Sequence, residues 1–261
     1  MLTSYTGPLL RARRASDNSE MEFGARGDGW LDTSALLSWA GTSSVLLVAL
    51  YDQTGQARHA VQATAARQPR LVNAGVLDAV NDRPTIRFDG SDDFLEIQGT
   101  TAFSNGRGAL TLGAVVLRRG EVANVSQQVV YANTATGLTR ANIGFLTTES
   151  YKAVAGGRRL DSDSYQRIVS PSVPAVNNWW RLIGRHRYSA AAADLAINGV
   201  VTTGGYQTAG LTASTPQTVN VLIGATQSPG EWLVGSMTAV VAAQAALDIA
   251  ALDAALAKAA P

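Results

Sequence analysis

Three groups of residues in the sequence have types and spacings that could support chemistry. Tyr51, Asp52 and Gln53 follow one another, and His59 lies a short distance further on. A second group clusters three aspartates within residues 89–93, and the third consists of five tryptophans. Such side chains suit sugar recognition, cation binding or acid–base chemistry, and each group also has an ordinary structural interpretation.

The aspartate cluster raises the question of a glycosidase, because these enzymes place two carboxylates at a defined separation across a cleft. The chain has twenty acidic residues, so pairs of acids arise easily by chance. Asp89, Asp92 and Asp93 lie between two strand-like stretches, 85–88 and 94–97, with a glycine and a serine among them. We favour a polar turn here. Calcium binding by these three aspartates is the alternative, because hard cations take oxygen ligands from such loops.

The segment that begins at Tyr51 is the best sequence candidate for a sugar site. Asp52 and Gln53 could bind hydroxyl groups, with His59 nearby and the Tyr51 ring beside them. The structural alternative is that Asp52 and Gln53 satisfy the backbone of the following loop, and we favour it. A lone histidine such as His59 is more often a structural hydrogen-bonding residue than a base.

Two tryptophans are candidates for exposure and therefore for stacking on a ligand or a partner. In the expected strand at 179–188, Trp179 lies on the same face as the arginines. Trp232 follows a proline–glycine loop. The other tryptophans are expected in the core.

Composition excludes several classes of function. The chain has no cysteine and two histidines, so disulfides, thiolate chemistry and multi-histidine metal sites are excluded. No phosphate-binding glycine loop or serine nucleophile elbow is present. The formal net charge is +1, and the arginines are dispersed, so nucleic-acid binding is not expected. We expect no cofactor, no membrane insertion and no signal peptide.

The hydrophobic pattern predicts an all-β fold. Short strand-like segments are separated by turn residues, which is typical of a sandwich or barrel. The expected strands are residues 45–51, 85–88, 94–97, 110–117, 128–132, 142–146, 151–155, 165–169, 179–188, 194–197, 219–223 and 233–241. Asn198-Gly199 predicts a tight hairpin, because a type I′ turn requires two residues with positive φ. The chain is expected to form one domain over 1–261, with an N-terminal arm at about 1–30.

Two helices and one strand orientation are also predicted. Asp32 or Thr33 should begin a short helix that ends at Ala40. The alanine-rich stretch 242–260 should form a second helix, with an apolar stripe of Ile249, Leu252 and Leu256. In the strand at 179–188, alternation predicts a core face with the following side chains: Trp180, Leu182, Gly184, His186 and Tyr188. The alternate set, rich in arginine, is expected to face solvent.

Several stretches of the chain resemble a known module. They are residues 9–18 with 31–37, residues 50–64 continuing through 68–72, and residues 83–95, together with the later Trp180, Ile197-Asn198-Gly199 and Gly235. The motifs Tyr51-Asp52-Gln53-x-Gly55 and Phe88-Asp89-Gly90 are the most specific parts. They resemble the N-terminal part of the α-L-arabinofuranosidase B catalytic domain, and equally a set of bacteriophage tail and virion proteins. The resemblance implies a concanavalin-A-like, laminin-G-like jelly roll: two antiparallel sheets with a short N-terminal helix and a C-terminal helix.

The departures from the enzyme pattern decide what the resemblance implies for function. The arabinofuranosidases have a vicinal cysteine pair in the substrate pocket, and this chain has no cysteine. Their catalytic carboxylates also fall on no matching motif. The resemblance therefore implies the fold and not the reaction, and we expect a protein that is not an enzyme.

Three functional hypotheses follow. The preferred one is a structural or binding component of a bacteriophage virion, such as a decoration, head-fibre or tail-fibre protein. It would be a homo-oligomer located in the virion, with other virion subunits and host-surface polysaccharide as partners. The alternatives are a glycoside hydrolase related to α-L-arabinofuranosidase B and a free-standing, lectin-like carbohydrate-binding module.

Overall fold

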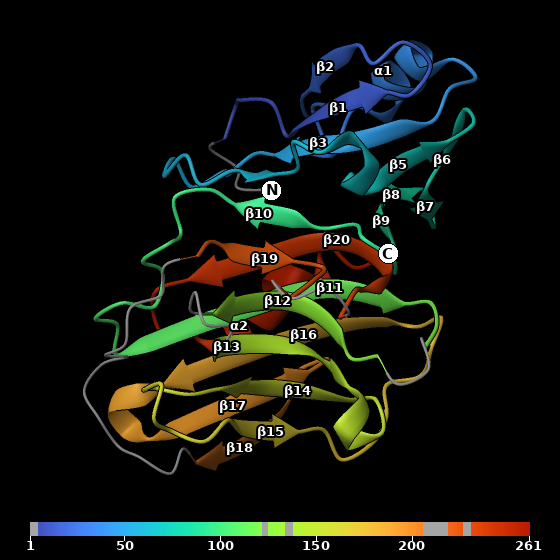
Figure 1. The fold of residues 1–261 in the computed structure, drawn as a ribbon. Coiled ribbons are helices and arrows are strands. Elements are labelled where there is room, and N and C mark those ends of the chain that lie inside the picture. The colour runs from blue at the N-terminus through green and yellow to red at the C-terminus, as the bar shows by residue number, and fades with distance from the viewer. Residues whose placement is uncertain (1–4, 122–124, 134–137, 206–218, 227–230) are drawn as a thin grey trace.

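The computed structural model describes residues 5–121, 125–133, 138–205, 219–226 and 231–261. Residues 1–4 of the expected N-terminal arm lie outside this range. The described strands form two layers that are joined at strand β3 (Val45–Leu50) (Figure 1). The start of β3 pairs with β5 (Arg70–Asn73), and its end pairs with β4 (Ala60–Val61). One strand therefore belongs to both layers.

The first layer continues from β5 by a series of antiparallel pairings. In spatial order its strands are β18 (Val200–Gly205), β17 (Ala192–Ile197), β16 (Trp179–Arg187), β11 (Ala109–Arg118), β20 (Val234–Ala243), β9 (Ile86–Asp89) and β5. The C-terminal strand β20 thus lies inside this sheet, between β11 and β9.

The second layer continues from β4 and is also antiparallel. In spatial order its strands are β15 (Gln166–Val169), β14 (Lys152–Gly157), β13 (Thr139–Leu146), β12 (Gln127–Asn133), β19 (Val221–Ile223), β10 (Leu95–Ile97) and β4. Smaller elements complete the chain. These are β1 (Leu10–Arg14) and β2 (Glu20–Phe23) beside β3, β6 (Val76–Leu77) beside β5, and the β7 (Ala79–Val80) and β8 (Arg83–Pro84) pair. The predicted two-sheet antiparallel sandwich is confirmed.

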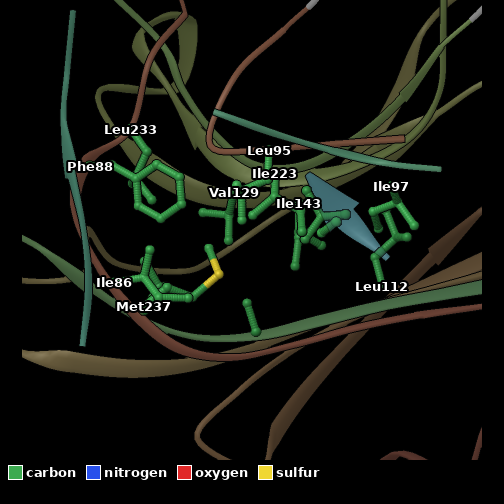
Figure 2. Packing of buried hydrophobic residues seen from close by; sticks show 14 of the residues in the cluster. Ile86, Phe88, Leu95, Ile97, Leu112, Val129, Ile143, Ile223, Leu233 and Met237 are labelled. Carbon is green, nitrogen blue, oxygen red and sulfur yellow. The ribbon is translucent and has the colours of Figure 1, made fainter. Parts of the chain in front are cut away.

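The core lies between the two layers, and Figure 2 shows part of it. Phe88 of β9 and Met237 of β20 come from the first layer, while Ile143 of β13 and Ile223 of β19 come from the second. Gly184 lets the layers approach closely, because a Cβ at this position would lie 2.5 Å from Cγ2 of Ile143. A side chain there would therefore force the sheets apart.

The two predicted helices are present, although one is shorter than expected. Helix α1 (Thr33–Ala40) begins after Asp32, whose side chain accepts a hydrogen bond from the Ala35 N–H. Helix α2 (Ile249–Ala257) begins after Asp248 in the same way. The expected helix over 242–260 is too long, because β20 continues through Ala243.

The predicted solvent face of β16 is wrong, because helix α2 covers it. Ile183 on this face packs in a cluster with Ile249 and Leu256 of the helix. The Arg181 guanidinium donates two hydrogen bonds to Asp253, at 2.8 and 3.0 Å. Alternation identified the two faces of the strand correctly, but it could not show that a later segment packs on the arginine face.

The core face of β16 is as predicted. Leu182 and His186 are completely buried, and Trp180 packs against the main core. The hairpin at Asn198-Gly199 is also confirmed, with φ values of 48° and 84° that join β17 to β18. Among the described residues, no helix has the length and apolar character needed to span a membrane.

Candidate functional site

The Tyr51 segment forms a loop that is held by its own side chains. The Asp52 carboxylate accepts hydrogen bonds from the Thr54 N–H at 2.8 Å, the Thr54 hydroxyl at 2.7 Å and the Arg58 N–H at 3.1 Å. His59 Nδ1 accepts a hydrogen bond from the Asp52 N–H at 3.1 Å. These contacts are the structural role that the sequence favoured for Asp52 and His59.

The Tyr51 ring is also engaged within the protein. Its hydroxyl donates to the Glu22 carboxylate at 2.5 Å, and its ring meets His59 edge-on with centroids 4.8 Å apart. Burial, together with the hydrogen bond to Glu22, raises the pKa of Tyr51 to about 12. Gln53 is half-buried in the same loop. A ligand-binding role for these residues stays a prediction.

The three clustered aspartates form the predicted polar turn. The Asp89 carboxylate accepts hydrogen bonds from the N–H groups of Ser91 and Asp92, and the Asp93 carboxylate accepts one from the Asp89 N–H. One carboxylate oxygen from each aspartate lies within 4.8 Å of the others. Burial, followed by the Asp89 charge, raises the pKa of Asp93 to about 7. Calcium binding here stays a prediction.

The two candidate tryptophans have different surroundings. Trp179 is half-buried and packs against the cluster beneath α2. Trp232 is also half-buried, and its ring lies 6.0 Å from that of Phe94. Trp232 directly follows Glu231, which belongs to a polar network that the sequence did not single out.

This network lies on the outer face of the second sheet, away from the core. In β13, Ala141 and Ile143 face the core, so the intervening Asn142 faces outward. The Asn142 side-chain amide donates to Gln128 Oε1 of β12 at 2.8 Å. Gln128 Nε2 in turn donates to Glu231 Oε2 at 3.0 Å.

Tyr165, in the segment before β15, completes the network. Its hydroxyl donates to Asn142 Oδ1 at 2.9 Å. The hydrogen bonds therefore all run in one direction, from the Tyr165 hydroxyl through two side-chain amides to the Glu231 carboxylate. The Glu231 carboxylate is therefore the final acceptor of the chain of hydrogen bonds.

Glycines on the strands next to these residues provide the space for the network. At Gly156 of β14, a Cβ would lie 2.0 Å from the Tyr165 hydroxyl and 2.9 Å from Asn142 Oδ1. At Gly144 of β13, a Cβ would lie 2.9 Å from Gln128 Oε1. Alanine at either position would displace a polar group, so both glycines are structural requirements of this surface.

Burial and nearby charges of both signs act on the pKa values of two tyrosines in and beside the network. Burial raises the pKa of Tyr165, and the Glu231 charge raises it further while Arg167 lowers it. Burial also raises the pKa of the neighbouring Tyr131; the Glu231 charge adds to this rise, and Arg158 opposes it. Both hydroxyls consequently stay protonated at neutral pH, and that of Tyr165 uses its proton in the hydrogen bond to Asn142.

Burial divides the network into two parts. Gln128 and Asn142 are 2% and 1% exposed, so they position other groups and do not meet a ligand. Tyr165, Glu231 and Trp232 are half-buried and keep surface in contact with solvent. The signal that could have revealed the site is a polar residue inside an apolar strand, as at Asn142.

Solved structures similar to the chain have the same sandwich. An arabinofuranosidase complexed with arabinofuranosyl-α-1,2-xylobiose has a TM-score of 0.69 at 14% identity, over 97% of this chain and 59% of the other. A GH54 α-L-arabinofuranosidase soaked with a cyclic sulfate inhibitor has a TM-score of 0.66 at 13% identity, with the same coverage. A Trypanosoma rangeli sialidase has a TM-score of 0.51 at 12% identity, over 77% of this chain and 29% of the other.

No protein-family model and no curated protein sequence matches the chain. The chain spans about three fifths of the length of the arabinofuranosidases, at 59%. At these identities the likeness shows the fold alone. The virion assignment made from the sequence is corrected, because the three similar structures named above are two arabinofuranosidases and a sialidase, and none of them indicates a virion component. The chain has the jelly-roll-like sandwich found in GH54 arabinofuranosidases.

Proposed function

We propose that the chain is a carbohydrate-binding domain whose ligand lies over the outer face of the second sheet, at Tyr165 and Glu231. The observation that carries the proposal is the directed hydrogen-bond network from Tyr165 through Asn142 and Gln128 to Glu231. It fixes a hydroxyl and a carboxylate beside the second sheet, and the two residues that carry them are half-buried.

The chemistry of these groups suits a sugar. A hydroxyl of a sugar both donates and accepts hydrogen bonds, so it pairs with a carboxylate or with a tyrosine hydroxyl. Trp232 directly follows Glu231 and offers an aromatic face for the C–H side of a sugar ring. The buried amides of Gln128 and Asn142 hold the binding groups in place, which reduces the entropy lost on binding.

Binding without hydrolysis is the preferred form of the proposal. Glycosidases of the usual kind need two carboxylates about 5–9.5 Å apart. Every acidic residue of the chain lies in the described ranges, and Glu231 is the one carboxylate that bonds to this network. The other acids that bear on the site pair elsewhere, as Glu149 does with Arg167 and Asp161 does with Arg140.

The ligand class to test first comes from the similar structures. One arabinofuranosidase is complexed with an arabinofuranosyl-xylobiose, so arabinofuranosyl oligosaccharides are the natural probes. Isothermal titration calorimetry should give saturable binding. Tyr165→Phe and Glu231→Gln should each weaken it by about tenfold or more, because each removes a hydrogen-bonding group of the site, and a buried partner left unsatisfied costs about 1–3 kcal/mol. Tyr5→Phe is the matched control and should bind as the wild type does, because the Tyr5 hydroxyl donates to the Pro8 carbonyl outside the network.

The same samples separate binding from hydrolysis, which is the second candidate because Glu231 places a carboxylate in the site. Release of arabinose from an aryl arabinofuranoside, abolished by Glu231→Gln, would favour the hydrolase. Absence of binding to every arabinofuranosyl, xylosyl and sialyl oligosaccharide would refute both candidates.

A further inference from the structure

Strand β18 is an edge strand at the open side of the sandwich. Among the described strands it pairs with β17 alone, and it forms the lower boundary of the first layer in Figure 1. A strand edge has unpaired N–H and C=O groups, which can pair with another strand. Proteins usually protect such an edge with charges, prolines or a bulge.

Within its own residues, strand β18 has no charge, no proline and no bulge. Residues 200–205 read Val-Val-Thr-Thr-Gly-Gly, and the pairing with β17 runs through all six residues without a register shift. Val200 and Val201 are 70% and 46% exposed. Exposed β-branched residues on an uncharged, regular edge are the usual signature of a strand that pairs with another.

An apolar pocket lies directly beside this edge. It has a volume of about 250 Å³ and is lined by Val200 and Thr202 of β18, Trp180, Ile197, and the connection after β15 that contains Pro171 and Pro174. Two further exposed valines, at 173 and 176, belong to the same connection between β15 and β16. The described exposed apolar surface is therefore concentrated at this side of the sandwich.

We propose that β18 pairs with β18 of a second copy of this chain, in a two-fold symmetric antiparallel dimer that extends the first sheet across both copies. The partner strand is β18 of a second copy, because two β18 edges are complementary to each other when they run antiparallel. A two-fold axis perpendicular to the sheet places the corresponding faces of the two strands on the same side of the extended sheet. Two-fold symmetric interfaces are the commonest in soluble oligomers.

The sizes of the side chains fix the register. Centring the axis on Thr202 places Val200 opposite Gly204 and Val201 opposite Thr203. In this register Val200 of each copy, the most exposed valine, lies opposite Gly204 of the other copy. The edge has no charged residue, so like charges do not oppose each other in this pairing.

The direction of the peptide groups agrees with this register. In a two-residue hairpin the residues beside the turn, Ile197 and Val200, form a hydrogen-bonded pair. Peptide groups alternate along a strand, so those of Val201 and Thr203 point away from β17. These two residues are the ones that face each other across the proposed dimer.

Sedimentation equilibrium tests the dimer. The wild type should show a reversible monomer–dimer equilibrium. Val201→Lys should shift the dissociation constant upward by at least tenfold, because a charge on the edge opposes strand pairing. Val76→Lys is the matched control, because Val76 is 69% exposed on β6 and lies away from the edge. A wild type that is monomeric at every concentration up to about 1 mM would overturn the proposal.

The absence of cysteine permits a second test that reports the register. Thr202→Cys introduces one thiol per chain, and residues facing each other in a non-hydrogen-bonded pair have Cα atoms about 4.5 Å apart. This separation allows a disulfide. Under mild oxidation this variant should form covalent dimers far faster than Val76→Cys. Equal rates for the two variants, or a dimer that persists in Val201→Lys, would place the interface elsewhere and refute the proposal.

Discussion

Arg181 of β16 and Asp253 of α2 form a paired hydrogen bond that fixes the C-terminal helix to the first sheet. Both side chains are mostly buried, at 23% and 14% exposure. The pair lies beside the cluster of Ile183 and the apolar residues of α2. The helix is therefore held by both apolar packing and a directed ionic contact.

A double-mutant cycle measures this contact. Arg181→Met and Asp253→Asn should show a coupling free energy of unfolding of about 1–2 kcal/mol, because the pair is bidentate and shielded from solvent. The exposed pair of Arg26 and Asp28 is the control and should show about 0.5 kcal/mol or less. Urea unfolding of the four variants in each cycle provides the measurement. Equal coupling in the two pairs would contradict the prediction.

Gly156→Ala should disrupt the candidate carbohydrate site. The new Cβ would overlap the Tyr165 hydroxyl, so the hydrogen bond to Asn142 should be lost. We expect a loss of about 1–3 kcal/mol in the free energy of unfolding and weaker sugar binding. Gly27→Ala is the control, because no atom lies within 4 Å of a Cβ at that position. The prediction is wrong if chemical denaturation gives the same stability for both variants.

Asp93→Asn should stabilise the protein at alkaline pH. The raised pKa of Asp93, about 7, means that folding favours its protonated form. Stability is therefore lost as the pH rises from about 4 to 7. The variant should exceed the wild type by up to about 4 kcal/mol at pH 8, since each pKa unit is worth about 1.4 kcal/mol, and the difference should vanish below pH 4. Melting temperatures across this range provide the measurement, and an unchanged difference at all pH values would contradict it.

Burial of His186 should make the protein less stable as the pH falls, which is opposite in sign to the effect of Asp93. Burial lowers its pKa to about 4, so the unfolded chain binds a proton more readily than the folded one below pH 6.5. Stability should fall by about 3 kcal/mol as the pH drops from 6.5 to 4. The Asp93→Asn background isolates this effect, because Asp93 titrates in the same range with the opposite sign. Stability that is flat between pH 6.5 and 4 in that background would exclude it.

Features that depend on neighbouring residues were predictable from the sequence. Asp32 begins α1 through a hydrogen bond to a residue three positions away. Asn198-Gly199 supplies the two positive φ angles of its own turn. Alternation also placed Leu182 and His186 on the core face. In each case the physical cause lies within a few residues of the effect.

Features that depend on distant segments were not predictable in this way. Gln128 and Glu231 are 103 positions apart, and only the pairing of the strands brings them together. The arginine face of β16 is covered by a helix that begins at Ile249. A periodic pattern states that a strand has two faces, but it does not state what packs on each of them.

The position of β20 has a consequence for synthesis of the chain. This strand pairs with β11 on one side and with β9 on the other, although it is the last of the described strands in the sequence. Until residue 243 has emerged from the ribosome, β11 and β9 lack their shared neighbour in the first sheet. Closure of that sheet must therefore wait for synthesis of β20, so the sandwich should fold as one unit rather than progressively from its N-terminal part.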